Sequence, residues 1–146
     1  MLRNRLVRWA GVFLLLFLAS CTTVEVQPVD TTAHVIKKVT VLVNNDVAVK
    51  DFISVLEKRI LFHGMTCYVS RDNDDKGKGY VLTYTARRSW DHILFLNYAE
   101  LNLSYNGELI AHAVYKMPNA IHVNKFDSTE TKMNPVIDEL FGYLKQ

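Results

Sequence analysis

The chain has 146 residues, of which 49% are hydrophobic, with 17 lysine and arginine residues against 15 aspartate and glutamate residues. This length is typical of one domain and excludes two. A formal charge of +2 without a dense basic patch excludes a nucleic-acid-binding protein.

Residues 1–20 are predicted to be a signal peptide. Arg3, Arg5 and Arg8 precede an apolar run at residues 9–18, which matches the basic and hydrophobic regions of a secretory signal. Ten helical residues span roughly 15 Å, about half of the roughly 30 Å hydrocarbon core of a bilayer. The run is therefore too short for a transmembrane helix.

The sequence that follows, Leu18-Ala19-Ser20-Cys21, resembles the lipobox of bacterial lipoproteins. The resemblance implies that Cys21 becomes the N-terminus and carries acyl chains such as palmitate, which anchor the protein in a membrane. Enterobacterial lipoproteins that stay in the inner membrane have Asp after this cysteine, whereas this chain has Thr22. We therefore expect a protein that is lipid-anchored in the outer membrane and faces the periplasm.

Removal of the signal peptide changes both the charge and the number of free thiols. The mature chain keeps 14 basic and 15 acidic residues, so it is near neutral, and no nucleic-acid partner is expected. Lipidation of Cys21 leaves Cys67 as the one thiol, so the mature chain cannot form an internal disulfide.

The mature chain is predicted to hold one folded domain. Residues 21–33 contain few bulky apolar side chains and include Pro28, so they are predicted to be the lipidated cysteine and a flexible tether. Residues 34–146 are predicted to form a single periplasmic domain.

Hydrophobic patterns predict the elements of this domain in chain order. Strands are expected at residues 35–43, 65–71, 80–89, 93–105 and 109–116, and Asn106-Gly107 predicts a tight turn between the last two. Helices are expected around residues 52–61, before Gly64, and around residues 135–144, because apolar residues there recur at helical spacing.

In outline the order is β-α-β-β-β-α, a right-handed β-α-β crossover followed by a meander. It predicts an α+β fold, a two-layer sandwich with a mostly antiparallel five-stranded sheet and two helices on one face. The second face of the sheet stays open in this arrangement. Strand alternation assigns the following residues to the open face: Thr83, Arg87, Leu94, Leu96, Tyr98, Ile110, His112 and Val114.

This predicted face is apolar enough to dock a partner. An equally supported alternative is that loops or the segment around Trp90 fold over it. The most unusual local cluster is Arg87-Arg88-Ser89-Trp90-Asp91. An exposed arginine beside Trp90 can recognise an anionic or aromatic partner, and the alternative is that Trp90 plugs the edge of the core. The predicted partner-binding residues are Arg87, Arg88, Trp90, Leu96, Tyr98 and Ile110.

The sequence contains no pattern that is typical of catalysis or metal binding, so we expect a non-enzymatic protein without metal or cofactor. It lacks a nucleophile elbow, a phosphate loop and zinc-ligand spacing. The loop that starts at Asp72 matches a calcium loop at its first, third and sixth positions. Lys76 and Thr83 occupy two of the remaining ligand positions, so the loop is predicted to be a solvated turn.

Several short segments resemble a family of small uncharacterised lipoproteins from Gram-negative proteobacteria. They are residues 82–86, Trp90-Asp91, residues 98–101, Ala113 with Tyr115, and residues 132–135. Together with the lipobox, the resemblance implies a non-enzymatic accessory or partner-binding lipoprotein at the outer membrane, held by its N-terminal lipid, with an envelope protein as partner. The alternative is a periplasmic module that binds a small amphipathic ligand between the sheet and its flanking segments.

Overall fold

The computed structural model describes residues 22–118 and 124–143. The predicted signal peptide and the predicted lipidation site Cys21 lie outside these residues. No helix within the described ranges is long and apolar enough to cross a membrane.

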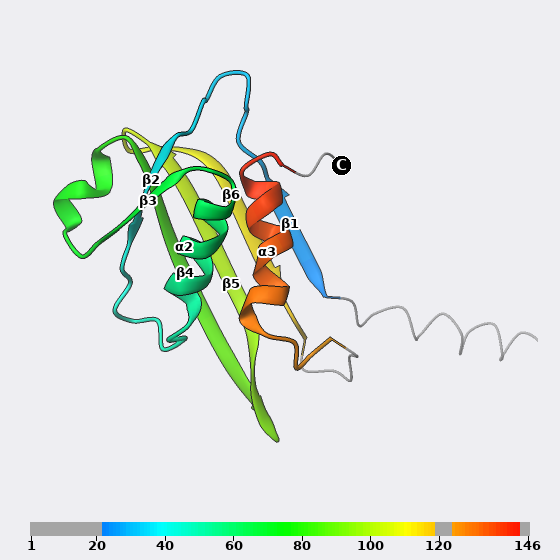
Figure 1. The fold of residues 1–146 in the computed structure, drawn as a ribbon. Helices are drawn as coiled ribbons and strands as arrows, with labels where there is room; N and C mark the ends of the chain where they lie inside the picture. The colour runs from blue at the N-terminus through cyan, green and yellow to red at the C-terminus, as the bar shows by residue number, and fades with distance from the viewer. Residues whose placement is uncertain (1–21, 119–123, 144–146) are drawn as a thin grey trace, which may run out of the picture.

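A six-stranded mixed sheet forms one layer, and two helices on one of its faces form the other (Figure 1). The sheet order is β1-β6-β5-β4-β2-β3. The elements are β1 (Thr23–Gln27), β2 (Lys38–Leu42), α2 (Phe52–Phe62), β3 (Thr66–Ser70), the 3-10 turn η2 (Asn73–Gly77), β4 (Tyr80–Asp91), β5 (Ile93–Tyr105), β6 (Glu108–Lys116) and α3 (Thr129–Leu140). The predicted α+β class is confirmed. The sheet has six strands, whereas five were expected and the outline order β-α-β-β-β-α contains four.

The sheet has a parallel part and an antiparallel part. Strand β2 pairs in parallel with both β3 and β4, and α2 connects β2 to β3. Strands β4, β5, β6 and β1 follow one another in antiparallel pairs. Asn106 and Gly107 both have positive φ and close the β5–β6 hairpin, as Asn-Gly pairs favour.

The strand that the sequence analysis did not predict is β1. It lies in the segment that was predicted to be a flexible tether, and that prediction is wrong for the described part of residues 21–33. Strand β1 pairs with β6 from Thr23, opposite Lys116, to Gln27, opposite His112. The alternation Thr-Val-Glu-Val-Gln suits an edge strand, because Val26 packs against the core while its neighbours stay exposed. Further along, buried Val29 donates its N–H to the Leu140 carbonyl at 2.9 Å.

The helices form where apolar residues repeat at helical spacing and where suitable residues end each helix. In α2 the buried positions are Phe52, Val55, Leu56 and Ile60, and Gly64 follows the helix with φ +76°. The Ser128 side chain caps α3 by accepting a hydrogen bond from the Thr131 N–H at 3.0 Å.

The core fills the space between the helices and one face of the sheet. Its fully buried members include Leu82, Leu101, Leu103, Ile137 and Leu140. Cys67 is half-buried beside this core, and burial raises the pKa of its thiol to about 11, so it stays protonated at neutral pH. Neither of the two described helices packs against the opposite face of the sheet.

Candidate functional site

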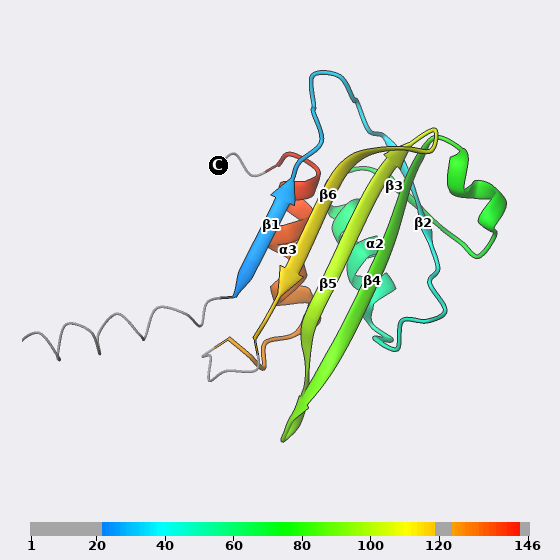
Figure 2. The same cartoon turned by 180° about the vertical axis from the view of Figure 1, so that it is seen from behind.

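The sheet face opposite the helices carries a polar surface. Figure 2 shows β1, β6, β5 and β4 on this side, where no described segment lies over them. Neighbouring strands align their residues into three rows: Gln27, His112, Asn102 and Thr83; Glu25, Val114, Glu100 and Thr85; Thr23, Lys116, Tyr98 and Arg87. From here on, the open face means the surface formed by these three rows, in place of the set of residues predicted from the sequence. It is far more polar than predicted.

Hydrogen bonds connect side chains of successive rows of the open face. The Tyr98 hydroxyl donates to Glu100 Oε2 at 2.6 Å, and Asn102 Nδ2 donates to Glu100 Oε1 at 3.2 Å. Because this orients the Asn102 amide, its Oδ1 accepts from His112 Nδ1, 2.7 Å away. The chain of bonds fixes four side chains on a surface that water can reach.

Charge on the open face is concentrated around Glu100. The hydrogen bonds from Tyr98 and Asn102 lower the pKa of Glu100, so the carboxylate is ionised at neutral pH. The Arg87 guanidinium lies over the Tyr98 ring at 4.4 Å from its centroid. A partner therefore meets a carboxylate, an amide, an imidazole and a stacked cation side by side.

Leu96 does not belong to the open face, contrary to the sequence prediction. Arg87 pairs with Tyr98 but Arg88 pairs with Leu96, so Asn97 is the extra residue of a β-bulge. A bulge changes which residues point to each face, and Leu96 turns into the core with 1% of its surface exposed. Nothing in the sequence indicates that Asn97 is an extra residue, so alternation along the strand assigned Leu96 to the wrong face.

Ile110 was also assigned to the open face, and it is half-buried against the core instead. It lies at a second bulge, since Leu103 pairs with Ala111 whereas Ser104 pairs with Leu109. Leu94, another predicted open-face residue, is exposed at the end of the β4–β5 hairpin.

The two remaining predicted partner-binding residues, Arg88 and Trp90, have different surroundings. Arg88 reaches toward the helices, where it forms an ion pair with Asp51 at 2.6 Å. Trp90 does not plug the core, because its side chain is largely exposed. Of the six predicted partner-binding residues, Arg87 and Tyr98 are the two that the structure brings together on the open face.

A groove of about 610 Å³ lies near the other edge of the sheet, and the sequence analysis missed it. Its lining includes Tyr68, Tyr80, Tyr105, Lys38, Lys78 and Asp75. Lys38 Nζ lies 4.2 Å from the centroid of the Tyr68 ring. These residues are distant in the sequence, and they meet because the sheet places β5, β4, β2 and β3 side by side in this order. Tyr80 at the start of β4 and Tyr105 at the end of β5 are the sequence feature that could have indicated the groove.

The turn that was compared with a calcium loop is held by its own side chains. Asp72 caps η2 by accepting from the Asp74 N–H at 2.9 Å, and Asp75 accepts from the Ser70 hydroxyl at 2.7 Å. In residues 22–118 and 124–143, no three histidine, cysteine or acidic side chains gather in a way that could hold a metal ion.

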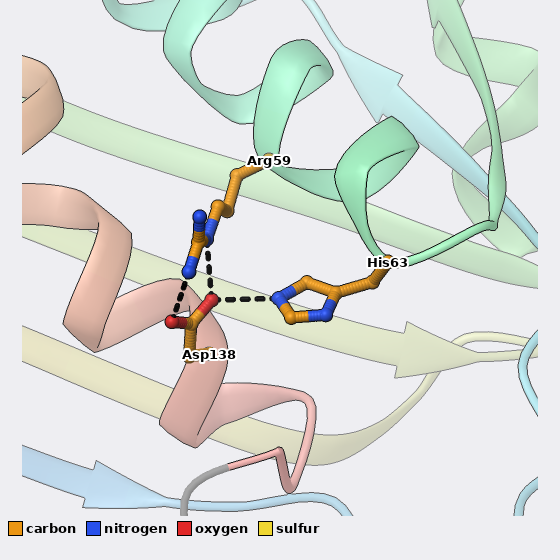
Figure 3. Close-up of polar contacts among 3 residues, drawn as sticks. All are labelled: Arg59, His63 and Asp138. Carbon is orange, nitrogen blue, oxygen red and sulfur yellow. Dashed lines mark hydrogen bonds and ion pairs between the residues drawn. The ribbon is translucent and has the colours of Figure 1, made fainter.

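A further polar cluster lies between the two helices, which cover the face of the sheet opposite the open face (Figures 1 and 3). Asp138 of α3 accepts hydrogen bonds from Arg59 of α2, through Nε and Nη2, and from His63 Nε2 at 2.7 Å. The His63 ring stacks on Tyr143, with 3.8 Å between ring centroids. Both carboxylate oxygens of Asp138 accept hydrogen bonds within the cluster, so the cluster joins the two helices.

Comparisons with known proteins identify the fold but no family. No family model matches the chain, and no curated protein matches it. Two crystal forms of PelC from Paraburkholderia phytofirmans, both described as dodecamers, are similar in structure. The first is 12% identical with a TM-score of 0.57 over 85% of this chain and 98% of PelC. The second is also 12% identical, with a TM-score of 0.53 over 80% and 97%.

Proposed function

We propose that the chain is a non-enzymatic lipoprotein of the bacterial cell envelope, anchored in the outer membrane through Cys21, which uses its open face to bind a partner protein in the periplasm. The observation that carries this proposal is the chain of hydrogen bonds from Tyr98 through Glu100 and Asn102 to His112, on a sheet face that no described segment covers. Ordered polar side chains lose little entropy on binding, which favours recognition.

The position of β1 limits the distance between the domain and a lipid anchor at Cys21. Thr23 is the first residue of the sheet and is two residues from Cys21. Two residues span at most about 7 Å. The domain of a lipidated chain is therefore held close to the membrane, and a partner must approach it there.

The first partner to test is a further copy of the chain. Both PelC structures are described as dodecamers, and this shared fold supports self-assembly here. An envelope protein that docks on the same face is the other partner of this proposal.

The test is crosslinking in intact cells with a double substitution, Arg87→Glu with Tyr98→Ala. We expect it to lower the crosslinked fraction at least about tenfold, because it reverses the exposed charge and removes the aromatic support. The matched control is Lys58→Glu, which reverses a largely exposed charge on α2, on the opposite side of the sheet. Equal crosslinking in the two variants would show that the open face is not the docking surface.

The groove favours a second candidate function, the binding of a small amphipathic ligand. Its three tyrosines can cover an apolar body, and Lys38 can pair with an anionic head group. Native mass spectrometry of protein from a periplasmic extract should then show a retained ligand that Lys38→Glu loses and Lys50→Glu, at an exposed position outside the groove, keeps. A protein of bare mass in all three samples would contradict this function.

A further inference from the structure

The end of the β4–β5 hairpin exposes large apolar side chains that no described part of the protein covers. Trp90, Ile93 and Leu94 are 69%, 59% and 56% exposed. We call residues 90–94 the hairpin tip. The turn at its end is closed by His92, which has φ 57° and adds no apolar surface. Three such residues within five positions are unusual for a surface in contact with water alone.

The hairpin tip points toward the end of the sheet at which the chain enters. Thr23, the first residue of β1, is in the row of Lys116, Tyr98 and Arg87. Strand β4 continues beyond this row for four residues, Arg88 to Asp91. At about 3.3 Å per residue the tip extends about 13 Å past the start of β1 (Figure 2).

The turn at residues 124–127 adds to the same surface. Phe126 is exposed and meets Phe95 edge to face, with 6.2 Å between ring centroids. Lys125 forms an ion pair with Asp91 of the tip, which balances the negative charge of that carboxylate. Arg87 and Lys116, in the row of Thr23, place two further cations where the tip leaves the sheet.

We propose that the hairpin tip inserts into the interface of an anionic lipid bilayer, the membrane that holds the N-terminal lipid. This inference rests on the proposed anchor at Cys21, which brings the tip to the bilayer. Tryptophan favours the interfacial region, and Ile93 and Leu94 favour the acyl chains below it. Arg87 and Lys116 are placed to pair with lipid phosphates.

The experiment uses the fluorescence of Trp90. The sequence has two tryptophans, Trp9 and Trp90, and the first belongs to the predicted signal peptide, so the processed chain has a single tryptophan, which can be excited selectively. The chain purified from cells that express the full sequence is reconstituted with vesicles of phosphatidylethanolamine and phosphatidylglycerol, with or without brominated acyl chains. We expect emission at shorter wavelength than in lipid-free buffer and quenching by the brominated lipids.

The matched control places the probe at the far end of the sheet. Leu109 is 57% exposed, and the Leu109→Trp variant in a Trp90→Phe background moves the fluorophore there. Quenching of Trp90 should be at least about twofold stronger than that of this control. Replacing Ile93 and Leu94 with Ser should weaken the quenching of Trp90, and Leu109→Ser should leave it unchanged.

The outcomes separate this inference from the proposed function. A chain that fails to float with the vesicles overturns the lipid anchor itself. A chain that floats, with Trp90 quenched no more than the Leu109→Trp control, overturns only the insertion of the tip. Emission that is already shifted without lipid, and that depends on protein concentration, assigns the tip to contacts between copies and also overturns it.

Discussion

Replacing Leu96 with Asp is expected to lower the free energy of unfolding by about 4 kcal/mol or more, because a carboxylate would be buried without a partner. The Leu96 side chain is 1% exposed, between the sheet and the helices. A loss of this size removes most of the stability of a typical domain of this length. Urea unfolding followed by circular dichroism measures it.

The matched control is Leu94→Asp, two residues earlier on the same strand. Simple alternation places the two leucines on one face, but Leu94 lies at the hairpin tip, where it is largely exposed. Its substitution should change the free energy of unfolding by no more than about 0.5 kcal/mol. Equal losses in the two variants would contradict the burial of Leu96 and with it the bulge at Asn97.

Substitution of Asp138 with Asn should cost about 2–3 kcal/mol of unfolding free energy, because it leaves Arg59 without its carboxylate partner in a mostly buried cluster. The matched control is Glu130→Gln. Glu130 pairs with Lys58 between the same two helices, but at 4.0 Å and with both side chains largely exposed. That change should cost at most about 0.5 kcal/mol. Similar losses for both would mean that the cluster does not hold the helices together.

The same cluster predicts how stability depends on pH. Burial on its own raises the pKa of Asp138, but the hydrogen bonds from Arg59 and His63 outweigh it, so the pKa lies below its ordinary value of 3.8. A lowered folded-state pKa stabilises the protein above about pH 4, the unfolded-state value, and this contribution is lost as the pH falls through the folded-state value. The difference between the wild type and Asp138→Asn should therefore shrink below pH 4. A constant difference from pH 7 to pH 3 would contradict this assignment.

Much of the fold was predictable from the sequence because its patterns are local. The helical spacing of Phe52, Leu56 and Ile60 and the turn at Asn106-Gly107 predict elements that the structure contains. Strand β1 was missed because an edge strand buries only one side and needs few bulky residues. The neighbour of β4 was not predictable either, since pairing of β4 with β2 depends on contacts that are distant in sequence.

The candidate site was harder to predict, for two physical reasons. Each bulge shifts the alternation by one residue, so Leu96 and Ile110 were assigned to the wrong environment while Tyr98 and His112 were assigned correctly. The groove gathers residues from four strands and a turn, and such a set has no spacing that a sequence could reveal. Arg87 and Trp90 were singled out from their types alone, and the structure gives them separate surroundings.

The central claim, an envelope protein anchored through Cys21, is tested most directly by mass spectrometry of the N-terminal peptide of the protein isolated from the membrane fraction. The account predicts a chain that begins at Cys21 and carries acyl chains. It also predicts that Cys21→Ala abolishes both the modification and the membrane association. A chain that begins elsewhere, or a Cys21 without lipid on a protein that still fractionates with the membrane, would contradict it.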